Sequence, residues 1–221
     1  MDFATQRTNM VESQVRPSDV TDRRIIRAMR ALPRERFVPE PVQTLAYSDG
    51  PVPMSAEGGA ARRLMLPARV LAKLVQAAEI DPGATVLHVG AGTGYGSAVL
   101  SQLALAVVAL ESAPALAAKA RTELAALGCA NVSVVEGPLT EGWADGGPYD
   151  AIVVEGAIEE APDRLLDQLK DGGRLVAILG RGASGRATVW QRQGRAFGAV
   201  DVFDAAGETL PGFEQPRAFA F

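Results

Sequence analysis

The chain has 221 residues, enough for a sizeable core, and 48% of them are hydrophobic while 22% are charged. Its formal net charge of −4 gives no electrostatic case for nucleic acid or an anionic membrane as a partner. Cys129 is the only cysteine, which excludes an internal disulfide and a cysteine-based zinc site; we expect a structural thiol and no metal. Without an apolar signal segment, or an apolar run near the ~18 residues of a membrane span, the sequence predicts a cytoplasmic protein.

Residues 1–80 are expected to form a helical extension with a substrate-side loop. Helices are predicted at 22–31 and 68–78, and the Pro-rich stretch 33–67 between them is expected to be irregular. Arginines are dense between residues 23 and 36, but acidic residues interrupt them. This pattern favours a solvated helix face over an anion-binding patch. These arginines are Arg23, Arg24, Arg27, Arg30, Arg34 and Arg36.

Residues 81–221 are expected to form a second unit in which strands and helices alternate. Strands are predicted at 85–89, 105–110, 132–135, 151–154 and 174–179, and helices at 95–103, 116–127 and 162–169. Such alternation is typical of right-handed βαβ units in a doubly wound parallel sheet.

The tail changes character, because two strand candidates, 187–191 and 199–203, flank the turn 193–195 and indicate an antiparallel hairpin. The predicted fold class is therefore α/β. We expect a Rossmann-like class I methyltransferase fold, with a mostly parallel seven-stranded sheet, an antiparallel C-terminal hairpin and an N-terminal helical extension.

A glycine loop lies directly between the strand 85–89 and the helix that begins at Tyr95. In Gly90-Ala91-Gly92-Thr93-Gly94 the glycines let the backbone turn sharply and approach a ligand without a Cβ in the way. A dinucleotide fingerprint would need glycine at Tyr95, and no Lys-Ser or Lys-Thr pair follows to make a phosphate-binding loop. The loop suits the smaller, zwitterionic S-adenosylmethionine (SAM).

Glu111 follows at the end of the next strand, 21 positions after Gly90. A carboxylate there accepts hydrogen bonds from both ribose hydroxyls of an adenosine cofactor, with Ser112 beside it. An ordinary acid at a helix N-terminus would also be favourable at this position. Together, the loop and the spaced acid favour a nucleoside-type cofactor.

Five groups of motifs lie along most of the chain, at 32–39 with 46–49, at 86–95, at 142–143, at 149–152 and at 169–176. Together they resemble the protein-L-isoaspartate O-methyltransferase family. The resemblance implies SAM as cofactor and a protein or peptide substrate, because members methylate the α-carboxyl of isoaspartyl residues. It also implies that Gly90, Ala91, Gly92, Gly94, Glu111, Ser112, Pro138 and Leu139 form the cofactor site.

Three positions depart from the family pattern. Met65 replaces the serine of a Thr-Ile-Ser-Gln-Pro stretch, and a thioether cannot orient a carboxylate by a strong hydrogen bond. Pro138 replaces the aspartate that would accept from the adenine amine, so the base pocket is expected to be more apolar, with a backbone contact from Leu139. His88 replaces an acid and is either a satisfied strand residue or a group that stiffens the glycine loop by a hydrogen bond.

No catalytic residue is predicted, because an ionised carboxylate nucleophile needs no general base. Arg62 and Arg63 are interpreted either as partners of an anionic substrate or as solvated loop arginines. The main expectation is SAM-dependent methylation of a carboxylate, and the alternative is a non-catalytic or repurposed SAM-binding protein. A nicotinamide-dependent reductase is disfavoured by Tyr95 and by the hairpin. The sequence leaves the oligomeric state open.

Overall fold

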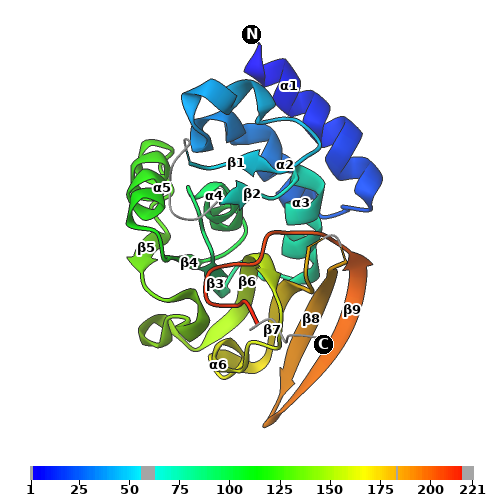
Figure 1. The fold of residues 1–221 in the computed structure, drawn as a ribbon, viewed down its shortest axis with the longest axis vertical. Coiled ribbons are helices and arrows are strands. Elements are labelled where there is room, and N and C mark those ends of the chain that lie inside the picture. The colour runs from blue at the N-terminus through cyan, green and yellow to red at the C-terminus, as the bar shows by residue number, and fades with distance from the viewer. Residues whose placement is uncertain (1, 56–62, 183, 216–221) are drawn as a thin grey trace, which may run out of the picture.

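A computed structural model describes residues 2–55, 63–182 and 184–215, and a twisted sheet forms the centre of this part of the chain (Figure 1). Seven strands lie in the order β5-β4-β3-β6-β7-β8-β9, parallel from β5 to β7 and antiparallel in the two last pairs. This confirms the expected α/β class, with its mostly parallel sheet and antiparallel hairpin. The strands are β3 (Thr85–Val89), β4 (Ala106–Glu111), β5 (Val132–Glu136), β6 (Tyr149–Ile158), β7 (Leu169–Leu179), β8 (Arg186–Gln193) and β9 (Ala196–Asp204).

Helices cover both faces of the sheet because the central strands carry apolar side chains in both directions. On one face Val86 and Val153 pack in a core with α3, α4, α5 and the N-terminal elements. On the other face Leu87 and Ile152 pack with α6 and the C-terminal segment, including Phe213. The α-helices are α1 (Phe3–Met10), α2 (Arg23–Ala31), α3 (Ala68–Ala77), α4 (Tyr95–Ser101), α5 (Pro114–Ala126) and α6 (Asp163–Leu166).

Element ends differ from the sequence prediction mainly around α6. The helix predicted at 162–169 ends at Leu166, because Leu169 already pairs with Tyr149 at the start of β7. Residues 171–173, which precede the strand predicted at 174–179, are therefore an irregularity inside β7, where Gly172 takes a φ of +80°. Strand β6 is longer than predicted and reaches Ile158.

The N-terminal part contains elements that the sequence analysis missed. Helix α1 has little apolar periodicity and depends on Asp2, whose carboxylate accepts from the backbone N–H groups of Ala4 and Thr5. Within the irregular stretch, short 3-10 helices form at Arg34–Phe37 and Glu40–Leu45, and β1 (Val52–Pro53) pairs with β2 (Leu64–Met65). These residues share one core with the sheet, and the division at residue 80 stays a prediction.

Arg34 corrects the expectation of a solvated arginine face. Arg23, Arg27 and Arg30 are exposed as expected, but Arg34 is fully buried. Its guanidinium donates to the carbonyl oxygens of Ala46 (2.8 Å) and Leu66 (2.6 Å), which replaces the water it loses.

The order of the strands positions a site. From β3 the chain runs through α4 to β4 and through α5 to β5, so that both strands lie on one side of β3. The next strand, β6, lies on the other side of β3. The carboxyl ends of β3 and β6 therefore form the switch point at which doubly wound folds bind ligands. No helix in the described ranges is long and apolar enough to cross a membrane.

Candidate cofactor and acceptor site

The glycine loop lies at this switch point with the backbone that only glycine adopts easily. Gly90, Gly92 and Gly94 have φ values of +76°, +57° and +99°. The N–H groups of Gly90 and Ala91 donate to the carbonyl of Leu110 at 3.0 and 3.1 Å, which fastens the loop to the end of β4. Helix α4 then begins at Tyr95 with Gly94 as its N-cap.

Glu111 lies beside this loop with its side chain fully buried. One carboxylate oxygen accepts from the N–H groups of Ser112 (2.8 Å) and Ala113 (2.9 Å), and the other accepts from the N–H of Gly92 (2.7 Å). These donors fix the orientation of the carboxylate at the carboxyl end of β4.

Pro138 and Leu139 follow β5 and lie next to the end of β4, because the Gly137 N–H donates to the Glu111 carbonyl at 3.2 Å. Leu139 is buried in the second core and begins a short 3-10 helix. The fold thus brings all eight predicted cofactor residues to one edge of the sheet. Their contact with a cofactor stays a prediction.

Arg63 is not a solvated loop residue. Its guanidinium is buried and forms a bidentate ion pair with Glu111, with Nη1 to Oε1 at 2.9 Å and Nη2 to Oε2 at 3.0 Å. Nη2 also donates to the carbonyl of Gly90 at 3.2 Å. Arg62, the other arginine considered for an anionic substrate, lies outside the described residues.

A cavity of about 470 Å³ opens beside the loop. Arg63 and Arg69 supply cations to its wall, where Arg69 pairs with Asp49, and Glu155 supplies a buried carboxylate. Met65 lies nearby in β2 and is fully buried, so it presents no hydrogen-bonding group where the family has a serine.

His88 connects two elements near the loop. Its Nδ1 lies 2.8 Å from the hydroxyl of Ser97 in α4, and its Nε2 lies 3.0 Å from Oε2 of Glu155 in β6. His88 thus contacts the helix that follows the loop, and its effect on the loop stays a prediction. Glu155 was missed in the sequence analysis, although an acid in the apolar run 151–158 is a recognisable signal. Gly96 makes room for the pair, because a Cβ there would lie 2.1 Å from Glu155 Oε2.

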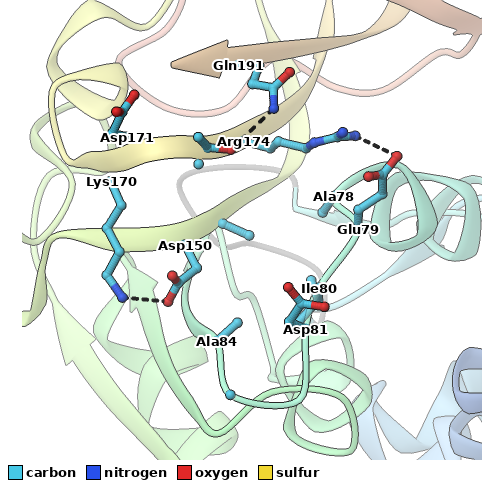
Figure 2. A pocket seen from close by; sticks show the side chains of 14 residues that line it. Ala78, Glu79, Ile80, Asp81, Ala84, Asp150, Lys170, Asp171, Arg174 and Gln191 are labelled. Carbon is cyan, nitrogen blue, oxygen red and sulfur yellow. Dashed lines mark hydrogen bonds and ion pairs between the residues drawn. The ribbon is translucent and has the colours of Figure 1, made fainter. Parts of the chain in front are cut away.

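A second cavity, of about 480 Å³, lies at the opposite, amino end of the strands (Figure 2). Four of its charged side chains form two ion pairs, Lys170 with Asp150 at 2.8 Å and Arg174 with Glu79 at 2.7 Å. Ligands of doubly wound sheets bind at the carboxyl ends of the strands, so these ion pairs are interpreted as structural.

The fold and the site together define a Rossmann-like protein of the class I methyltransferase type, with a glycine loop and a buried acid at the switch point. Residues 5–202 match the model of the protein-L-isoaspartate (D-aspartate) O-methyltransferase family, and the chain belongs to this family.

Relatives and solved structures support this membership. The chain is 42% identical over 187 residues to protein-L-isoaspartate O-methyltransferase 1 of Rhodopseudomonas palustris, covering 85% of this chain and 74% of the relative. It is 40% identical over 191 residues to the enzyme of Methanoculleus marisnigri, covering 86% and 84%. A solved protein-L-isoaspartate O-methyltransferase superposes with a TM-score of 0.82 at 25% identity, covering 93% of this chain and 66% of the other. A Plasmodium falciparum structure in complex with S-adenosyl-L-homocysteine (SAH) shares the fold, with a TM-score of 0.73, 18% identity and coverage of 95% and 98%.

Family membership confirms the resemblance seen in the sequence, the methyltransferase class and SAM as the methyl donor. The residues fit this cofactor in two respects: the glycines have the required backbone, and Glu111 offers carboxylate oxygens at the correct strand end. Which carboxylate receives the methyl group is a separate question.

Proposed function

We propose that this chain transfers a methyl group from SAM to a carboxylate of a protein or peptide, with the isoaspartyl α-carboxylate as the first candidate, in the cytoplasm. The observation that carries the proposal is the membership of residues 5–202 in a family defined by this reaction. The glycine loop and Glu111, brought together at the switch point, provide a cofactor site of the kind the reaction needs.

The chemistry requires little from the protein besides positioning. SAM supplies a methyl group already activated by its sulfonium, and an acceptor carboxylate is ionised at neutral pH, so orientation is the main contribution of the chain. Glu111 would be the acceptor for the ribose hydroxyls, and the cavity beside the loop provides room for an acceptor side chain near Arg63 and Arg69. A guanidinium can bind a carboxylate through two parallel hydrogen bonds.

The test is a methyl-transfer assay with an isoaspartyl peptide and its normal aspartyl counterpart. We expect transfer to the isoaspartyl peptide alone. Met65→Ser should raise the rate by restoring a hydroxyl near the acceptor, and Met65→Ala is its control, because it opens a similar space without a hydroxyl. Equal transfer to both peptides, or none to either, would contradict the isoaspartyl assignment.

A non-catalytic protein that keeps the fold and the cofactor is the second candidate. It is favoured by the loss of the serine hydroxyl at Met65, which is fully buried. Incorporation of labelled methyl from SAM into any protein of a cell extract would rule against it.

A further inference from the structure

Three side chains of this chain fill the space over the glycine loop. We call them the plug: Met54 after β1, Arg63 before β2, and Leu210 in the C-terminal segment. A Cβ on Gly92 would lie 2.5 Å from Met54 Sδ, and one on Gly90 would lie 2.9 Å from Leu210 Cδ1. The plug therefore contacts the face of the loop that the cofactor must reach.

Leu210 is held there by the sheet. Its N–H donates to the Ala157 carbonyl at 2.9 Å, and the Ala157 N–H donates to the Glu208 carbonyl at 2.9 Å, which ties the segment to the end of β6. In Figure 1 this segment, drawn in red, crosses near the ends of the central strands. It lies beyond residue 202, where the match to the family ends.

Arg63 is the member of the plug that competes directly with the cofactor. A carboxylate offers about four lone-pair sites. On Glu111 the backbone N–H groups of Gly92, Ser112 and Ala113 already donate three hydrogen bonds, and the guanidinium adds one to each oxygen, so the carboxylate has no free site left. Ribose hydroxyls gain hydrogen bonds to Glu111 only if Arg63 leaves.

A departing Arg63 needs a new anionic partner, because a buried guanidinium without one is costly. Arg63 already lines the cavity beside the loop, where Arg69 pairs with Asp49. Glu155 also lies on that wall, but it contacts Nε2 of His88 at 3.0 Å. A carboxylate that enters this cavity from outside offers the planar, two-oxygen partner that Arg63 now finds in Glu111.

We propose that Arg63 is the residue that binds the acceptor carboxylate, and that it exchanges Glu111 for this acceptor when the cofactor enters. The exchange makes cofactor and acceptor bind cooperatively, since each ligand removes a cost of binding the other. The acceptor half of this inference rests on the proposed function, whereas the competition for Glu111 does not.

The first test is calorimetric titration of SAH, which cannot react, into the wild type and Arg63→Gln without peptide. We expect the variant to bind SAH about tenfold more tightly, because the competing guanidinium is gone. Arg174→Gln is the matched control: it breaks an ion pair with Glu79 at the opposite end of the strands and should leave the affinity unchanged. Equal or weaker binding by Arg63→Gln would overturn the competition.

The second test adds an isoaspartyl peptide, with its asparaginyl counterpart as the uncharged control. In the wild type the isoaspartyl peptide should raise SAH affinity by about fivefold or more, and in Arg63→Gln it should have no effect. The variant should also show a raised peptide KM with kcat changed less. If the wild type methylates the isoaspartyl peptide but shows no such coupling, the acceptor role of Arg63 is wrong.

Two features keep these outcomes separate. If the wild type transfers no methyl group to the peptide, the proposed function fails, and the titration without peptide still decides the competition. If Arg63→Gln does not fold, Arg63→Lys replaces it: a lysine makes a point contact instead of a fork, so SAH affinity should rise less, by about threefold. No rise in this folded variant would overturn the competition.

Discussion

Glu111 joins the glycine loop to the start of α5 through its carboxylate. Gly92 donates to one oxygen, while Ser112 and Ala113 donate to the other, so local backbone alone orients the acid. The Arg63 ion pair adds a long-range partner from 48 residues earlier in the chain. The carboxylate oxygens of Glu111 thus stabilise the free protein, and the same two oxygens would accept hydrogen bonds from the ribose.

Replacement of Gly92 by valine tests the loop. Gly92 has a φ of +57°, and an added Cβ would lie 2.5 Å from Met54 Sδ. We expect Gly92→Val to abolish SAH binding in calorimetry and to lower the free energy of unfolding by about 1–3 kcal/mol through backbone strain. Gly128→Val is the control, since its φ is +69° and an added Cβ would meet nothing within 4 Å. It should cost similar stability without changing affinity. Unchanged affinity in Gly92→Val would refute the placement of the cofactor over the loop.

Arg34 connects its own short 3-10 helix to three other parts of the chain. From its short 3-10 helix it donates to Ala46 after the next such helix and to Leu66 after β2, and its guanidinium lies 4.7 Å from the ring centre of Tyr95 in α4. The N-terminal part is thereby fixed to the helix that follows the glycine loop.

Removal of this guanidinium should destabilise the protein strongly. Arg34→Ala leaves two buried carbonyl oxygens without their charged donor, and we expect a loss of about 3–5 kcal/mol in the free energy of unfolding, measured by denaturant titration. Arg36→Ala is the control, because Arg36 is 41% exposed and its buried partner Glu123 keeps a second ion pair with Lys119. Its loss should stay below about 1 kcal/mol. Equal losses in the free energy of unfolding for the two variants would show that the buried hydrogen bonds of Arg34 contribute little to stability.

At the scale of the whole molecule, the three tyrosines report on three parts of the fold. Burial and the hydrogen bond to Glu35 raise the pKa of Tyr47 beside the N-terminal elements, and burial raises the pKa of Tyr95 at the start of α4. Burial, with Asp145 nearby, raises the pKa of Tyr149 at the start of β6 to about 12.

These shifts predict a spectroscopic titration. The ordinary tyrosine pKa is 10.0, so at pH 10 the folded protein should show little tyrosinate absorbance, while the denatured protein should be about half ionised. Because the folded state holds these protons more tightly, their contribution to stability is complete below pH 10 and is lost as the pH rises towards 12. Tyr149→Phe should remove one third of the alkaline absorbance change. Half-ionisation of the folded protein at pH 10 would contradict the burial of these side chains.

Much of the fold followed from local patterns. The apolar runs of β3 and β4, the glycine loop and the turn before β9 predicted the doubly wound sheet and its hairpin, because strand propensity and turn chemistry act over a few residues. Helix α1 was missed, since capping by Asp2 and packing hold it and apolar periodicity is weak. The predicted end of α6 was wrong because pairing between Leu169 and Tyr149 overrides helix propensity there.

Local motifs were enough to predict the class of cofactor site: glycines at 90, 92 and 94 and an acid at 111 are chemical requirements of strand, turn and ligand that act over short stretches of chain. What surrounds Glu111 depends on long-range contacts that exist only in the folded protein. Arg63 and Leu210 reach the loop from segments far away in the chain, and no periodicity encodes such contacts. The sequence pattern leaves Arg63 equally open to solvent or substrate, but in the fold it is buried against Glu111, because folding pairs the charges that it removes from water.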